Sequence, residues 1–164
     1  MAQVTSSGSA KVTLPADEEI LITREFDAPR HLVYKAYTTP ELVRRWWAGK
    51  RGEVHTCEID LRVGGRWRYV MIAHGEHEVA FHGEYSEVVE NERLVTTEVY
   101  EGAPEGSAPA LDIVTFEEAG GRTTLTILMR VESREVRDMI IGTGMEGGMQ
   151  EGMDLLEQIA RELR

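Results

Sequence analysis

The sequence GTGMEGGMQEGMDLLEQIARELR at residues 142–164 decides the fold, because it contains the one predicted helix that is long enough to cover a sheet. Leu155, Leu156, Ile159 and Leu163 share one face of this helix, and acids and arginines occupy the opposite face. A helix with a single apolar stripe buries that stripe against another apolar surface. We therefore expect the rest of the chain to supply a sheet with one apolar face.

The first half of this segment combines flexible apolar residues with weak helix formers. Met145, Met149 and Met153 recur every four residues, so their side chains share one helix face. Methionine suits irregular apolar surfaces, and the stripe is explained either by core packing or by the lining of a ligand cavity. Each interior glycine weakens a helix by roughly 1 kcal/mol relative to alanine. Close packing against the sheet, an opening for a ligand or a kink between two helices would offset that loss, and we interpret the segment as an adaptable gate.

Segments with the two-residue period of β-strands fill the middle of the chain. Residues 18–29 alternate in this way and predict a first strand. Residues 30–37 and 40–47 then change to a helical period, which predicts two short helices. The six strands predicted after them cover residues 54–62, 66–73, 79–89, 94–100, 111–117 and 123–131.

The order of these elements predicts an α+β fold. Consecutive short strands favour antiparallel pairing. We expect a curved seven-stranded antiparallel sheet wrapped around the long C-terminal helix, with the two short helices after the first strand. Ser133 is expected to cap one more helix before the C-terminal one. Because a curved sheet and a straight helix do not fit flush, we also expect a cavity between them.

Composition predicts an ordinary cytoplasmic globular protein. The 164 residues suffice for about one domain, which we place at residues 18–164 after a flexible tail at residues 1–17. The net charge of −11 argues against nucleic acid as a partner, and no apolar run is long enough to span a membrane. Cys57 is the single cysteine and is predicted to be a buried small apolar residue. A monomer or a homodimer is expected.

One face of the predicted sheet is rich in aromatic residues. In RWRYVM at residues 66–71, alternate side chains place two aromatic residues and a methionine on the same face, and the next strand repeats this parity. Trp46 ends a short helix beside a loop, where it is a candidate for the cavity entrance, although simple core packing explains it equally well. The predicted cavity residues outside the methionine stripe are Trp46, Trp67, Tyr69, Met71, Phe81 and Tyr85.

Five blocks of the sequence resemble successive parts of one family. They are REFDAPRHLVYKAYTTPELVRRWW, EIDLRVGGRWRYVM, FHGEYSEV, ERLVTTEVY and TGMEGGMQEGMDLLEQI, in this order. The family is related to the C-terminal domain of the activator of the heat-shock-protein-90 ATPase and lies in the START-like, birch-pollen-allergen-like (SRPBCC) superfamily. The resemblance implies a helix-grip fold with an internal cavity for an apolar or amphipathic ligand. Family members commonly carry tryptophan where this chain has Met149.

Glu98 has two alternative placements. It shares parity with Leu94, Thr96 and Tyr100, and the family resemblance suggests that this set faces the cavity. A carboxyl group in an apolar cavity would have a raised pKa and could act as an acid or a base. A one-residue register slip would instead leave Glu98 in water, and the sequence alone favours that second placement.

No catalytic or metal-binding motif stands out. His74, His77 and His82 cluster around a predicted turn at Gly75, without the spacing of known zinc motifs, so we predict neither a metal nor a cofactor. The leading prediction is therefore a binding or carrier domain for a small apolar or amphipathic molecule, not an enzyme. The alternatives are a chaperone-interacting module and an enzyme that uses Glu98 in the cavity as acid or base.

Overall fold

The computed structural model describes residues 9–73 and 77–164, and its strands form one antiparallel sheet. The order across the sheet is β1-β2-β8-β7-β6-β5-β4-β3. From β3 to β8, each strand pairs with the next one along the chain, which makes a meander. β2 joins this meander through a long-range pairing with β8. The strands are β1 (Lys11–Thr13), β2 (Glu19–Phe26), β3 (Gly52–Ile59), β4 (Arg66–Ala73), β5 (His77–Val89), β6 (Arg93–Tyr100), β7 (Ala110–Ala119) and β8 (Arg122–Arg130).

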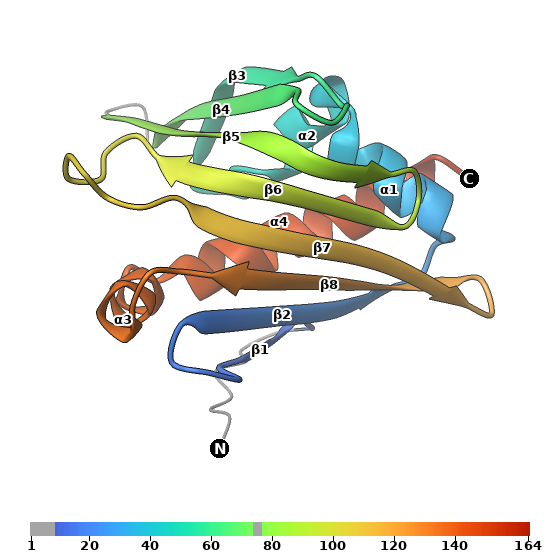
Figure 1. Ribbon diagram of the computed structural model, residues 1–164. Coiled ribbons are helices and arrows are strands. Elements are labelled where there is room, and N and C mark those ends of the chain that lie inside the picture. The colour runs from blue at the N-terminus through green and yellow to red at the C-terminus, as the bar shows by residue number, and fades with distance from the viewer. Residues whose placement is uncertain (1–8, 74–76) are drawn as a thin grey trace.

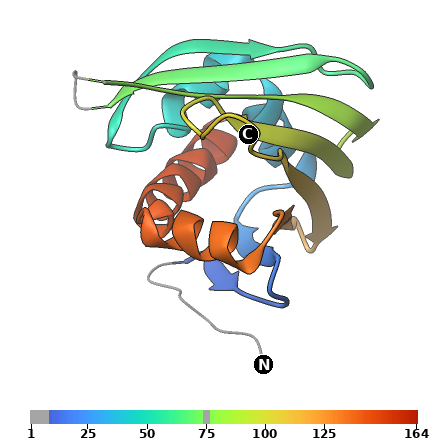
Figure 2. The same cartoon turned by 60° about the vertical axis from the view of Figure 1, so that its left-hand side comes forward.

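The helices pack on the concave side of this sheet. Figure 1 shows the long helix α4 (Met145–Glu162) crossing behind the strands, and Figure 2 shows the sheet curving around it. The short helices α1 (Arg30–Thr38) and α2 (Pro40–Trp46) follow β2, and α3 (Arg134–Gly142) leads from β8 into α4. The predicted α+β architecture, with a sheet that grips a C-terminal helix, is confirmed.

The sheet has eight strands, so the prediction of seven is wrong by one. The additional strand β1 pairs with β2, where Val12 lies opposite Ile22 and is fully buried. The expected flexible tail over residues 1–17 is therefore wrong for the part that forms β1, while residues 1–8 lie outside the described residues. Three residues are too few for an alternating pattern to be recognised, and β1 is fixed by contacts with distant parts of the chain.

Local sequence signals explain where the helices begin and break. Pro40 occupies the first turn of α2, and the Ser133 hydroxyl accepts a hydrogen bond from the Val136 N–H at 3.2 Å to cap α3. Gly144 adopts a φ of 80°, a left-handed conformation that glycine tolerates and other residues avoid. The chain turns there from α3 into α4. A kink between two helices, one of the features proposed to offset the low helix propensity of the glycines, is thus present.

The hydrophobic core lies between the concave face and the helices. Burying a large aliphatic or aromatic side chain contributes about 1.5–3 kcal/mol, so this layer is the main source of stability. Cys57 also lies in the core, as predicted, and burial raises the pKa of its thiol to about 11. The largest fully buried side chains are Phe26, Phe116, Ile20, Leu125, Leu156, Val12, Val33, Val43, Val70, Val114 and Thr123.

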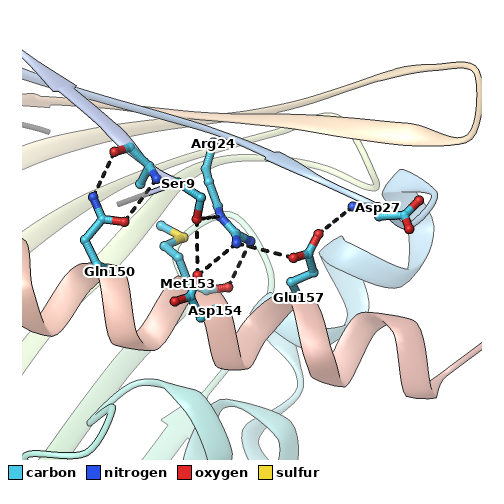
Figure 3. A network of polar contacts seen from close by, with 8 residues as sticks. Ser9, Arg24, Asp27, Gln150, Met153, Asp154 and Glu157 are labelled. Atoms are coloured by element: carbon cyan, nitrogen blue, oxygen red, sulfur yellow. Dashed lines mark hydrogen bonds and ion pairs between the residues drawn. The ribbon is translucent and has the colours of Figure 1, made fainter. Parts of the chain in front are cut away.

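A polar network fixes α4 against β1 and β2 (Figure 3). Arg24 of β2 is 5% exposed, and its guanidinium donates to the Met153 carbonyl at 3.1 Å and to the carboxylates of Asp154 and Glu157 at 2.9 and 3.3 Å. A buried guanidinium requires such partners, because its charge has lost contact with water. The network therefore sets the position of α4 along the sheet, and with it the height of the space between helix and sheet.

Candidate functional site

A cavity of about 340 Å³ lies between α4, α2 and the sheet. Its wall is mostly apolar, which is typical of sites for small organic ligands. The residues that line it are Ile22, Tyr37, Trp46, Trp47, Ala48, Arg51, Trp67, Tyr69, Met71, Phe81, Tyr85, Leu94, Thr96, Glu98, Asp112, Val114, Ile127, Met129, Met145, Gly148, Met149, Gly152 and Met153.

Aromatic rings from the helices and the sheet meet in this wall. The Trp47 ring packs edge-on against Tyr69 and Phe81, with centroids 5.2 and 5.7 Å apart. On the α1–α2 side, Tyr37 stacks on Trp46 at 5.4 Å, and the Trp46 indole N–H donates to the Ala36 carbonyl at 2.9 Å. These contacts fix the rings in defined orientations. The wall is thus rigid on the side of the sheet and of α2.

The methionine stripe forms the opposite side of the cavity. Met145, Met149 and Met153 all line it, and Met153 also belongs to the buried core. The period-two stripe on the sheet and the four-residue stripe on α4 therefore face the same space. All ten side chains predicted for the cavity, Trp46, Trp67, Tyr69, Met71, Phe81, Tyr85, Glu98, Met145, Met149 and Met153, lie in its wall. Their role in binding a ligand remains a proposal.

The glycines of α4 bring other parts of the chain close to the helix. A Cβ added to Gly152 would lie 3.0 Å from the backbone oxygen of Trp46, so α2 and α4 approach closely at this point. A Cβ added to Gly148 would lie 3.6 Å from the Arg51 side chain. Close packing against the sheet was one of the three offsets considered for the glycines; the close approaches at Gly148 and Gly152 are made to Arg51 and to α2.

Two carboxyl groups lie in the cavity wall. Glu98 on β6 lines the cavity. The alternative placement, in which a one-residue register slip exposes Glu98 to water, is therefore wrong. The pairing of β6 with β7 runs without a shift from Arg93↔Thr115 to Glu98↔Ala110, which keeps Leu94, Thr96 and Glu98 on the cavity face. Asp112 on β7 is 7% exposed and lines the same space.

Asp112 was missed by the sequence analysis, although a signal for it exists. In ALDIVTFEE it shares parity with the buried Val114 and Phe116, as Glu98 does with Leu94. Burial raises the pKa of Asp112 well above its usual range, and the charge of Glu98 and a hydrogen bond to it raise this pKa further. The raised pKa favours the protonated form of Asp112, in which its carboxyl group can also donate a hydrogen bond.

Tyrosine hydroxyls add donors to the wall. Burial is the main cause that raises the pKa of Tyr37, Tyr69 and Tyr85. These phenols therefore stay protonated, and each offers an O–H group to the cavity.

The histidine cluster of the sequence does not come together as a metal site in the described residues. His74 and the predicted turn at Gly75 lie outside them, and His77 is exposed. His82 lies on the outer face, where its Nδ1 is 2.9 Å from a Glu101 oxygen, and Arg68 binds the same carboxylate at 2.9 Å. The hydrogen bond from Arg68, and then the one with His82, lower the pKa of Glu101 to about 2. Within residues 9–73 and 77–164, no three His, Cys, Asp or Glu side chains are grouped so that they could hold a metal ion.

Within the described part of the chain, none of the helices combines the length and the apolar character needed to cross a membrane. No functionally curated protein gives a significant match to the sequence.

Solved structures share this fold over nearly the whole chain. A protein from Nitrosomonas europaea is 23% identical with a TM-score of 0.80, and the match covers 91% of this chain and 97% of that one. A protein from Rhodobacter sphaeroides is 19% identical with a TM-score of 0.82 and 99% coverage of both chains. A Mycobacterium smegmatis protein is 22% identical with a TM-score of 0.81 and 96% coverage of both.

The sequence itself carries the family signature. Residues 27–161 match the profile described as activator of Hsp90 ATPase homolog 1-like protein. This range begins just after β2 and ends within α4, so it includes most of the elements that build the cavity. The chain therefore belongs to the family of activator of Hsp90 ATPase homolog 1-like proteins.

Proposed function

We propose that this protein binds a small apolar or amphipathic molecule in the cavity between α4 and the sheet. The observation that carries the proposal is the cavity of about 340 Å³, closed by an aromatic wall on one side and by three methionines on the other. Its volume falls at the lower end of the range of about 300–1,000 Å³ for small-molecule sites. The family supports the proposal, because its fold commonly forms ligand-binding domains.

The lining suits a ligand that transfers from water into an apolar space. Each Å² of apolar surface removed from water contributes roughly 25 cal/mol, so a ligand body of modest size gains several kcal/mol. The methionines of α4 can change rotamer to fit different shapes, whereas the interlocked rings of Trp47, Tyr69 and Phe81 cannot. The site therefore combines one rigid wall with one adaptable wall.

Substitution of Met149 by tryptophan tests the proposal. The larger side chain would occupy the cavity, so titration with the fluorescent apolar probe N-phenyl-1-naphthylamine should show a loss of affinity of about tenfold or more. Filling a void adds dispersion contacts, so the free energy of unfolding should stay similar or rise. Met139→Trp is the matched control, because Met139 lies on α3, is 60% exposed and is outside the cavity lining.

The opposite result would reject the proposal. If Met149 is ordinary core, the substitution overpacks the protein and lowers its stability by roughly 1–3 kcal/mol. A destabilised Met149→Trp protein that binds the probe as the unmodified protein does would show that the methionine stripe does not contact a ligand.

Binding to a chaperone is the alternative that the description of the family suggests. It leads to a different expectation for the same variant. A surface contact with a heat-shock-protein-90 chaperone would survive Met149→Trp, because that side chain lies in the cavity wall. Analytical ultracentrifugation of both proteins with purified chaperone distinguishes the two functions. A stable complex combined with no probe binding would favour the chaperone.

A further inference from the structure

The carboxyl pair formed by Glu98 and Asp112 places acceptors in a mostly apolar cavity. Asp112 lies directly opposite Thr96 in the β6–β7 ladder, and Glu98 lies two residues beyond Thr96 on the same face. Asp112 is more than nine-tenths buried, and its Oδ1 atom has no hydrogen-bond partner among the described residues. An unpaired buried carboxyl oxygen is destabilising. Such an atom in a cavity wall indicates a partner that comes from the ligand.

The neighbouring side chains do not supply this partner. The Thr96 hydroxyl accepts a hydrogen bond from the Trp67 indole N–H at 2.7 Å, and its own proton faces the carbonyls of Glu84 and Thr97, both at 3.0 Å. Arg51 is the one lysine or arginine among the described lining residues, and it pairs with Glu151 at 3.5 Å. The carboxyl pair therefore has neither a cation nor a free hydroxyl of Thr96 as a partner.

The charge of the pair selects among possible head groups. Both carboxyl groups line the cavity, and Arg51, the one cationic side chain among the described lining residues, pairs with Glu151 instead of with them; an unpaired buried charge is costly. A ligand hydroxyl would satisfy a hydrogen bond and leave the charge unmatched, and a ligand carboxylate would be repelled. An ammonium group provides both the donors and the opposite charge. The aromatic rings of the wall add to this preference, because ring faces attract cations.

We propose that the cavity binds an amphipathic amine, with the ammonium group against Glu98 and Asp112 and the apolar body between the aromatic wall and the methionines of α4. This inference rests on the proposed function, since it assumes that the cavity binds a ligand. It adds the chemical class of the head group and assigns Asp112, together with Glu98, as the residues that determine specificity.

A matched set of ligands tests the inference. Decylamine, 1-decanol and decanoate share one apolar chain and differ in head group. Isothermal titration calorimetry near neutral pH should show that decylamine binds about tenfold or more tightly than 1-decanol, and that decanoate binds weakest. Asp112→Asn and Glu98→Gln should each remove most of the preference for the amine and leave the affinity for 1-decanol and for N-phenyl-1-naphthylamine similar. Glu117→Gln is the control, because Glu117 is an exposed carboxylate on the same strand.

The outcomes separate this inference from the proposed function. If the probe and 1-decanol bind but decylamine has no advantage, or if decanoate binds best, the amine inference fails and the proposed function stands. If none of the four compounds binds to the folded protein, both fail. A loss of all three decyl ligands in Asp112→Asn would show a structural role for this residue and would overturn its assignment to the head group. Should Asp112→Asn not fold, Glu98→Gln and the amine-to-alcohol ratio of the unmodified protein decide the question.

Discussion

Gln150 in α4 binds both backbone groups of Ala10, the residue that precedes β1. Its Nε2 donates to the Ala10 carbonyl at 2.8 Å, and its Oε1 accepts from the Ala10 N–H at 3.0 Å. One amide side chain thus satisfies a donor and an acceptor as a neighbouring strand would, and Ala10 is fully buried. The edge of the sheet is thereby tied to the helix that closes the cavity.

Gln150→Ala should lower the free energy of unfolding by about 2–3 kcal/mol, because both backbone groups of the buried Ala10 lose their partner. Urea denaturation followed by circular dichroism measures this change. Gln158→Ala on the same helix is the control, since Gln158 is exposed, and it should change stability by less than about 0.5 kcal/mol. Equal effects of the two substitutions would contradict the role given to Gln150.

Two glycines of α4 should respond in opposite ways to alanine. At Gly148 the added Cβ meets the Arg51 side chain at an ordinary 3.6 Å, so the gain in helix propensity should raise stability by up to about 1 kcal/mol. At Gly152 the added Cβ lies 3.0 Å from the Trp46 carbonyl oxygen, which belongs to the backbone of α2. That crowding should cancel the gain or reverse it. Thermal unfolding of both variants measures the difference. An equal gain in stability at both positions would show that α2 shifts to accommodate the added methyl group.

Asp112→Asn should stabilise the protein near neutral pH. Burial, and then Glu98, raise the pKa of Asp112 above its usual value of 3.8, so folding favours the protonated form. The contribution of Asp112 to stability is therefore complete below pH 3.8 and is lost as the pH rises through the folded-state pKa. The stability advantage of the asparagine variant should grow with pH over this window. Urea denaturation at several pH values checks it, and an advantage independent of pH would contradict the assignment.

The contribution of Glu101 to stability should show the opposite pH dependence. The Arg68 hydrogen bond, and then that of His82, lower its pKa from 4.5 to about 2. Its stabilising effect is therefore present above pH 4.5 and is lost as the pH falls toward 2. Glu101→Gln should be less stable than the unmodified protein near neutral pH, and the difference should shrink on acidification. A difference that stays constant between pH 6 and pH 3, measured by the same denaturation method, would argue against this ion cluster.

The sequence predicted what depends on local periodicity. The alternation in RWRYVM orients Trp67, Tyr69 and Met71, and the four-residue spacing orients the three methionines, because strand and helix geometry fix these directions. The placement of Glu98 depended on the register between β6 and β7, which is set by contacts of the whole sheet. The same parity argument would have identified Asp112, had it been applied to β7.

Contacts between distant segments could not be predicted in this way. Arg24 has the sequence pattern of an ordinary charged residue of a strand, yet three of its partners lie in α4, 129–133 residues away. β1 depends likewise on Gln150, which is 140 residues from Ala10. The local sequence around Arg24 or around β1 does not indicate such a distant pairing. The extra strand and the anchoring of the helix could therefore be recognised only in the structure.

The position of these anchors divides α4 into two parts that contact β2 and the segment before it differently. Within the described residues, the hydrogen bonds that tie α4 to β1 and β2 begin at Gln150, whereas Met145 and Met149 lie in the first turns, among two glycines. We expect the first turns to open more readily than the anchored part of the helix. Backbone amides of residues 147–149 should then exchange with deuterium through local opening, much faster than those near Leu156, which require global unfolding. The residence time of a ligand would be set by this fraying rate, so a substitution in the first turns could change how long a ligand stays without changing the stability of the protein.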